Sequence, residues 1–393
     1  MTTTAPTLPD ETDRARSLLD RFLHDTGVVS PAPPRRYLWT DAYAVQVCLA
    51  LHHRMPDQGY LEVAIRLVDQ VHEVLGRHRP DDARSGWISG LGTDEGADHP
   101  TAGGLRIGKP LPERAPGAPY DPRLEWDRDG QYFHYLTRWI DALDAVGAVV
   151  PEGPCSRWAI ELARTAYARF RVPEDSGRSR GLYWKMSIAL DRPLVPSTGQ
   201  HDALDGLATF AMLERDDGSG ERHENPLARE IRGLVTLCSG GSWATNDALG
   251  IGGLLTATCR LARVRAGGGS ARALIPSTIL HRATDDAVRS LRALDTDAFG
   301  LVAPGHRLAF RELGLAIGLA EVERLNRRSA GQTHIVDPRR LDAVVRALGE
   351  WTGLRHTIVG FWQRPDHRAV RSWTDHNDIN TVMLAAALVS GPG

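Results

Sequence analysis

The sequence predicts an all-α protein that folds as an (α/α)6 barrel, a toroid of six helical hairpins. Helical periodicity recurs along the 393 residues, and no alternation of β-branched residues is long enough to predict a convincing strand. Two kinds of helix alternate strictly, six of each, as expected for an inner ring covered by an outer ring. Tandem repeats in an open solenoid share this pattern, but the repeat length varies too much here for a regular solenoid.

The two kinds of helix differ in how many faces they can bury. The amphipathic series, predicted to be outer, comprises Asp10–Asp25, Tyr60–Arg77, Ser156–Arg171, Asn225–Cys238, Leu280–Leu294 and Asp337–Trp351. The series rich in Ala, Gly and Leu, predicted to be inner, comprises Thr40–His53, Asp129–Val146, His201–Leu213, Asn246–Arg263, Arg307–Leu325 and Asn377–Val389. Glycines inside the fourth inner helix, in Gly250-Ile-Gly252-Gly253, follow no strand and indicate close helix packing rather than a phosphate loop.

The domain organisation expected from this pattern is simple. Residues 1–9 form a flexible tail, and residues 10–393 form one barrel domain. Long connections near 78–126 and 172–200 are rich in Gly and Pro but contain apolar anchors such as Trp87 and Leu105. We therefore expect ordered lids over one end of the barrel.

Composition excludes several classes of function. Apolar residues make up 42% and charged residues 24%, which is typical of a globular protein, and the formal net charge is −2. Such a balance offers no basic field for nucleic acid or an anionic membrane, and no apolar run is long enough to cross a bilayer. The first residues lack the features of a signal peptide, so a cytoplasmic location is expected. The four cysteines have no ligand-like spacing and are expected to be buried thiols.

Polar and aromatic residues gather where the inner helices begin. Trp39-Thr-Asp41 opens the first and Trp373-Thr-Asp375 the last, and in a hairpin toroid all six leading ends face one mouth. A single acid there can be a helix cap, but Glu125, Asp127 and Asp129 exceed that need. The further residues expected to contact a ligand are Trp126, Gln200, Asp205, Asn246, Asp247, Glu312, Asn377 and Asp378.

Acids combined with indoles are typical of a saccharide site. The first hypothesis is hydrolysis of a glycosidic or related bond, with Asp129 as one carboxyl partner and Asp202 or Asp375 as the other. Trp39, Trp126 and Trp373 form the stacking rim. Arg106 and the two lysines of the chain, Lys109 and Lys185, reach in from the loops toward a carboxylate or phosphate of the substrate.

Two alternatives remain open from the residues themselves. His201 and His376 open different inner helices and could remove and return a proton beside a carbonyl, as a sugar epimerase or isomerase does. The third hypothesis is a saccharide-binding protein without catalysis. No cofactor and no metal are expected, although Asp375, His376 and Asp378 could form a metal site. The oligomeric state is not predicted.

The order of six hairpins with acids and aromatics at the inner leading ends resembles the six-hairpin glycosidase superfamily over nearly the whole chain. That resemblance implies the (α/α)6 fold and activity on glycosides. Gly199-Gln200-His201 followed by Asp205, and Trp373 with His376, are similar to the N-acylglucosamine 2-epimerase family, which implies isomerisation by paired histidines. That family places a histidine on its fourth inner helix, where this chain has Asn246-Asp247.

Overall fold

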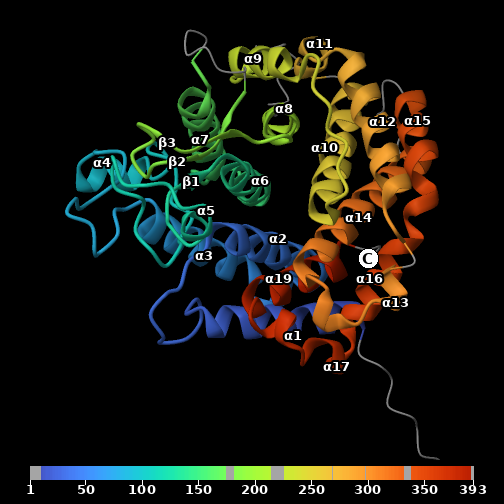
Figure 1. Cartoon of the computed structure of the whole chain (residues 1–393), viewed down its shortest axis with the longest axis horizontal. Coiled ribbons are helices and arrows are strands. Elements are labelled where there is room, and N and C mark those ends of the chain that lie inside the picture. The colour runs from blue at the N-terminus through green and yellow to red at the C-terminus, as the bar shows by residue number, and fades with distance from the viewer. Residues whose placement is uncertain are drawn as a thin grey trace, which may run out of the picture.

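The computed structural model describes residues 10–173, 181–213, 225–267, 269–296, 298–331 and 338–390. The predicted tail, residues 1–9, lies outside this set, as does part of the predicted lid at 172–200. Within the described ranges the chain is mainly helical, which confirms the all-α prediction (Figure 1). No helix among these ranges combines the length and apolarity needed to cross a bilayer.

Six helices of the described chain form a closed inner ring. They are α2 (Leu38–Arg54), α6 (Phe133–Val149), α8 (Asp202–Met212), α10 (Ala248–Ala266), α14 (Ala309–Gly331) and α19 (Asn377–Val389). Each packs on the next in this order, and α19 packs on α2, so the ring closes on itself. Closure confirms the (α/α)6 prediction over the open solenoid.

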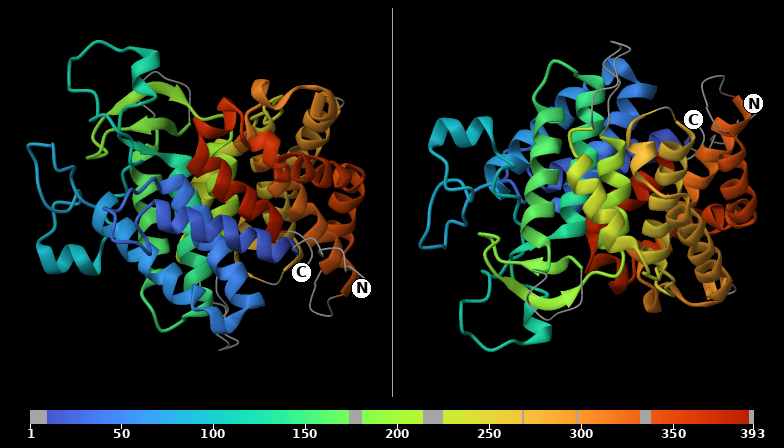
Figure 2. Two further views of the ribbon diagram at one scale, coloured as in Figure 1. Left: turned by 90° about the horizontal axis from the view of Figure 1, so that it is seen from below. Right: turned by 90° about the horizontal axis from the view of Figure 1, so that it is seen from above.

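The outer helices cover this ring in the predicted alternation. They are α1 (Glu11–Asp25), α3 (Tyr60–Leu75), α7 (Cys155–Phe170), α9 (Ala228–Cys238), α12 (Ser277–Ala293), α15 (Pro338–Leu348) and α16 (Gly353–Gln363). The first helix, α1, packs on the last, α19, so the two ends of the fold lie side by side (Figures 1 and 2).

Burial explains the two kinds of sequence. In α3 the buried apolar residues Ala64, Leu67, Val71 and Leu75 recur every three or four positions, which places them on one face. In α19 every residue from 380 to 389 is buried, because neighbours surround this helix on all sides. An outer helix therefore has one buried face and one charged face, whereas an inner helix such as α19 is buried on all sides.

The structure differs from the prediction at two helices. The sixth outer position is filled by both α15 and α16, and α16 was not predicted as a separate helix. The second inner helix begins at Phe133 rather than Asp129, because Gly130 has φ 150° and residues 131–132 enter a strand.

A small antiparallel sheet, which the sequence did not predict, borders the leading end of α6. Its strands are β1 (Gln131–Tyr132), β2 (Tyr183–Met186) and β3 (Pro193–Thr198), in the order β1-β2-β3, with Gln131 opposite Met186. Strands this short carry too few residues for a recognisable alternation.

Short helices complete the connections. They are η1 (Pro56–Gln58), α4 (Thr93–Asp98), α5 (Pro122–Glu125), α11 (Ala271–Leu274), α13 (Ala298–Leu301), η3 (Pro304–His306), η4 (Gly349–Trp351), α17 (Pro365–Arg368) and α18 (Arg371–Thr374). The connection between α3 and α6, which carries α4 and α5, stands out from the helical body (Figure 2).

Glycine permits the close approach of α10 and α14. A Cβ on Gly252 would collide with the backbone oxygen of Gly314, and a Cβ on Gly318 would collide with the backbone oxygen of Gly252. Gly253, the next residue of α10, has open space where its Cβ would lie. The two backbones therefore touch through Gly252, as the glycine pattern indicated.

We expect Gly252→Ala to destabilise the fold by about 1–3 kcal/mol, because the added methyl group forces two helix backbones apart. The matched change Gly253→Ala meets nothing and should be neutral or stabilising by up to about 1 kcal/mol through helix propensity. Urea denaturation of both variants measures the difference. Equal midpoints would contradict the close backbone contact.

Candidate functional site

The leading ends of the inner helices surround two adjoining cavities of about 1150 and 280 Å³. All six inner helices contribute: α8 lines the smaller cavity, α14 and α19 line the larger, and α2, α6 and α10 line both. The residues common to both cavities are Trp39, His134, Trp184, Asp247 and Leu249. The two hollows therefore share walls at one mouth of the barrel.

Just over half of the predicted site residues line these cavities. In the larger cavity they are Trp39, Arg106, Lys109, Trp126, Asp247, Asp375, His376, Asn377 and Asp378. In the smaller they are Trp39, Gln200, His201, Asp202, Asp205 and Asp247. The remaining eight line neither: Asp41, Glu125, Asp127, Asp129, Lys185, Asn246, Glu312 and Trp373.

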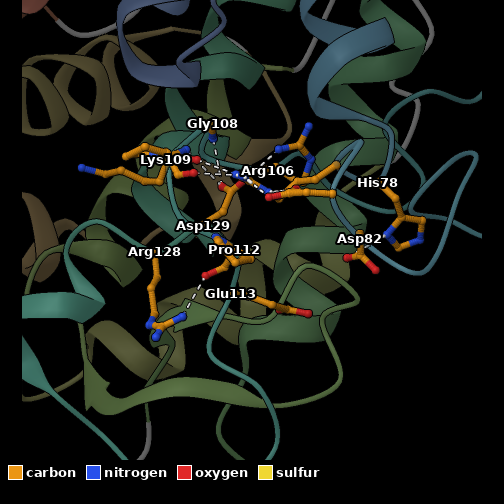
Figure 3. Close-up of polar contacts among 12 residues, drawn as sticks. His78, Asp82, Arg106, Gly108, Lys109, Pro112, Glu113, Arg128 and Asp129 are labelled. Carbon is orange, nitrogen blue, oxygen red and sulfur yellow. Dashed lines mark hydrogen bonds and ion pairs between the residues drawn. The ribbon is translucent and has the colours of Figure 1, made fainter. Parts of the chain in front are cut away.

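Asp129 is fully buried behind the cavity wall and holds a loop (Figure 3). Its Oδ2 lies 2.6 Å from Nη1 of Arg106 and 3.5 Å from Nη1 of Arg79. Its Oδ1 accepts hydrogen bonds from the backbone N–H groups of Gly108, Lys109 and Gly130. With every oxygen engaged by cations or amides, this carboxylate is a positioning group.

Lys185 is likewise a buried structural group. Its ammonium donates to the side chain of Glu125 at 3.0 Å and to the backbone oxygens of Glu125 and Arg128. The second oxygen of Glu125 accepts from Arg114 at 3.1 Å. These bonds tie β2 to the end of α5, so neither group is available to a ligand.

Three other predicted residues also have structural roles. Asp41 pairs with buried Arg36 at 3.4 Å, and burial raises the pKa of Asp41 to about 6. Glu312 accepts two hydrogen bonds from Arg307 and one from the indole of Trp362. Trp373 is buried in the core rather than at the rim.

The last two residues of the eight, Asp127 and Asn246, are exposed to solvent outside both cavities.

His134, on the first turn of α6, was missed by the sequence analysis. Its ring stacks on Tyr132 with centroids 5.3 Å apart and runs parallel to Trp184 at 6.3 Å. Trp39 and Tyr135 approach it edge-on. The run Tyr132-Phe-His134-Tyr135 was the available signal, but the prediction concentrated on the acids at 125–129.

Burial controls the protonation of His134 and of its neighbour Asp202. Nδ1 of His134 lies 3.7 Å from Oδ1 of Asp202, and desolvation lowers the pKa of His134 to about 4. Desolvation, reinforced by the nearby charge of Asp205, raises the pKa of Asp202 well above its usual range. At neutral pH His134 is therefore an uncharged imidazole that can accept a proton.

The two predicted histidines, His201 and His376, lie at the N-terminal ends of α8 and α19. His201 precedes α8, and its Nε2 faces the backbone oxygen of Trp243 at 2.8 Å, so Nε2 carries the hydrogen and Nδ1 the lone pair. Burial also lowers the pKa of His201. His376 precedes α19 and packs against Phe310.

Capping explains part of the acid cluster. Asp247 accepts the backbone N–H of Gly250 as the cap of α10, and its other oxygen pairs with Arg311 at 2.5 Å. No group of three His, Cys, Asp or Glu side chains suited to a metal ion occurs within the described ranges. Asp375, His376 and Asp378 thus do not assemble as ligands.

Neither a protein-family model nor a curated protein sequence matches this chain. Among solved structures, it is similar to cellobiose 2-epimerase from Spirochaeta thermophila DSM 6192, with 15% identity over 88% of this chain and 86% of the other and a TM-score of 0.45. A sugar epimerase from a ruminal bacterium shows 8% identity over 86% and 85%, with a TM-score of 0.44.

The prediction of glycoside hydrolysis is corrected. The chosen carboxylates do not face each other across one cavity. Asp129 lines neither cavity, whereas Asp202 lines the smaller and Asp375 only the larger. Both oxygens of Asp129 are also engaged by Arg106 and by backbone N–H groups, so neither is directed at a bound glycoside.

The two acids Asp129 and Asp375 should differ sharply in their effect on stability. We expect Asp129→Asn to lower the free energy of unfolding by about 3–5 kcal/mol, because Arg106 is left buried without its counterion. Asp375→Asn removes an exposed pair with Arg371 and should cost at most about 1 kcal/mol. Urea denaturation compares them, and equal losses would disprove the positioning role of Asp129.

The protonation of His134 can be followed directly. In protein labelled with ¹³C at histidine, we expect the His134 signal, identified by its loss in His134→Gln, to titrate near pH 4 rather than at the ordinary 6.5. Since burial penalises the charged ring, the neutral form should persist down to that pH. A midpoint at or above 6.5 would show that the ring is not desolvated.

Proposed function

We propose that this protein is a sugar epimerase or isomerase that moves a proton at a carbon next to a carbonyl group. One observation carries the proposal: His134, His201 and His376 line two cavities with common walls. His134 shares the larger cavity with His376 and the smaller with His201. Imidazoles from three inner helices thus line two adjoining cavities, with His134 on the wall that the cavities share.

The walls of this space suit a saccharide. Trp39, Trp126 and Trp184 line the larger cavity and offer indole faces for the apolar side of a pyranose ring. Gln200, Asn377 and the paired aspartates supply hydrogen-bond partners for hydroxyl groups. Apolar stacking combined with a few polar groups is typical of small-molecule sites.

The lowered pKa values of His134 and His201 favour the neutral rings that proton removal requires. A neutral ring, such as His134 or His201, takes the proton from the carbon beside the carbonyl, and the C–H electrons form the C=C bond of an enediol as the carbonyl oxygen gains charge. The imidazolium, or a second protonated ring, returns a proton. Return to the opposite face of the same carbon gives an epimer. Return to the neighbouring carbon, with the hydroxyl proton moving from one enediol oxygen to the other, gives an isomer.

The test is solvent exchange. Reducing sugars of gluco, manno and galacto configuration, as monosaccharides and β-1,4-disaccharides, are incubated with the protein in D₂O, and loss of the C2–H signal is followed by NMR. We expect exchange in the wild type, and a fall of about 10²–10⁴-fold on replacing a histidine that transfers the proton.

Each of the three histidines is changed to Gln, with His281→Gln as the control, because His281 is exposed on the outer helix α12. Circular dichroism checks that the variants fold. Exchange that is absent for every sugar, or that survives all three changes, would contradict the proposal. Saccharide binding without exchange would indicate a binding protein instead.

A further inference from the structure

Lys109 differs from every other cation on the wall of the larger cavity. Arg36 pairs with Asp41, and Arg79 and Arg106 pair with Asp129. Arg35 pairs with Asp378 and Arg311 with Asp247. Among the described residues no carboxylate lies within ion-pair distance of the Lys109 ammonium.

The acids that line the same cavity are already engaged. Asp247 and Asp378 belong to the pairs just named, and Asp375 pairs with Arg371. Each of these acids therefore has an arginine partner, and Lys109 is the lysine or arginine of the described wall that has no ion-pair partner. A half-buried charge without a counterion is costly unless a ligand or water compensates it.

The fold holds this ammonium in place. Asp129 accepts the backbone N–H groups of Gly108 and Lys109, and Gly108 has φ 90° with no room for a Cβ beside the backbone of Arg36. The side chain leaves this anchored backbone away from Asp129 (Figure 3). Its Nζ lies 5.3 Å from the centre of the Tyr37 ring. Burial lowers the pKa of Lys109, which agrees with a group withdrawn from bulk water.

We propose that the saccharide bound in the larger cavity carries an anionic substituent, a carboxylate or a phosphate, which pairs with Lys109. This inference rests on the proposed function in that the ligand is taken to be a saccharide. It adds the substrate class, an anionic sugar in preference to its neutral counterpart. An ammonium is a compact point charge that suits either anion.

Methyl glycosides test binding apart from catalysis, because they cannot open to a carbonyl and so cannot be turned over. Methyl glucuronide, methyl glucoside 6-phosphate and methyl glucoside, with their manno and galacto counterparts, are titrated while tryptophan fluorescence is recorded. Trp39, Trp126 and Trp184 line the cavity and report on occupancy. We expect at least one anionic glycoside to bind about ten-fold or more tightly than its neutral analogue, since a hydrogen bond to a charged group has that effect.

Three variants locate the source of this preference. Lys109→Gln should abolish the ratio between anionic and neutral dissociation constants, while Lys109→Arg should keep most of it. Arg364→Gln removes the same charge from an exposed residue whose partner, Asp366, also lies outside the cavity, and should leave the ratio unchanged. Added salt should reduce the ratio in the wild type.

The outcomes separate the two proposals. Equal affinities for anionic and neutral glycosides, or a preference that survives Lys109→Gln, overturn the anionic substrate class but leave the epimerase proposal standing. Failure of every glycoside to bind overturns the saccharide site, and this inference falls with it. Whichever of glucuronide and phosphate binds more tightly identifies the anionic group.

Discussion

The buried carboxylate of Asp129 is the constraint on which the mouth of this barrel depends. A fully desolvated anion is unstable unless cations and N–H donors surround it, and here they come from one long connection between α3 and α6. Arg79 and Arg106 approach from one side, and the backbone of Gly108 and Lys109 from another. One side chain thereby fastens the loop to the start of α6, and residues of this loop line the larger cavity.

The same principle organises the rest of the mouth. Lys185 with Glu125, Arg36 with Asp41 and Arg307 with Glu312 are pairs in which each buried charge satisfies the other. Such pairs orient loops and helix ends, yet they present no free acid or base to a ligand. A mouth dense in ionisable residues can therefore offer rather few reactive groups. Within the described part of the chain, the groups that remain are imidazoles, the carboxyl group of Asp202 and the ammonium of Lys109.

Aromatic packing gives these imidazoles their chemical character. The rings of Tyr132, Trp39 and Trp184 around His134 remove water and favour the uncharged form of the imidazole. An exposed histidine would be partly protonated near neutrality, whereas His134 is ready to accept a proton. The indoles thus have two consequences: they form apolar walls of the cavities, and they favour the uncharged form of the imidazole beside them.

The sequence by itself determined the helices, their alternation and their closure into a ring. The apolar periodicity of the helices and the small residues of α10 and α19 follow from how each residue is buried, so the pattern of residue types along the sequence shows them. It also located the leading ends of the inner helices as the place where polar groups meet. It did not distinguish Asp129 from Asp202, or Lys185 from Lys109, because each pair shares the same chemistry and a similar local context.

Only the tertiary structure decided which of these groups are compensated. The partners of Asp129 lie 20 to 50 residues earlier in the chain, and those of Lys185 lie about 60 residues earlier. The sequence did not identify His134 for the same reason: its neighbours Trp39 and Trp184 come from α2 and from β2, which are distant in the chain. Whether a charged side chain supports the fold or faces a ligand depends on neighbours that are distant in sequence, and no local pattern encodes them.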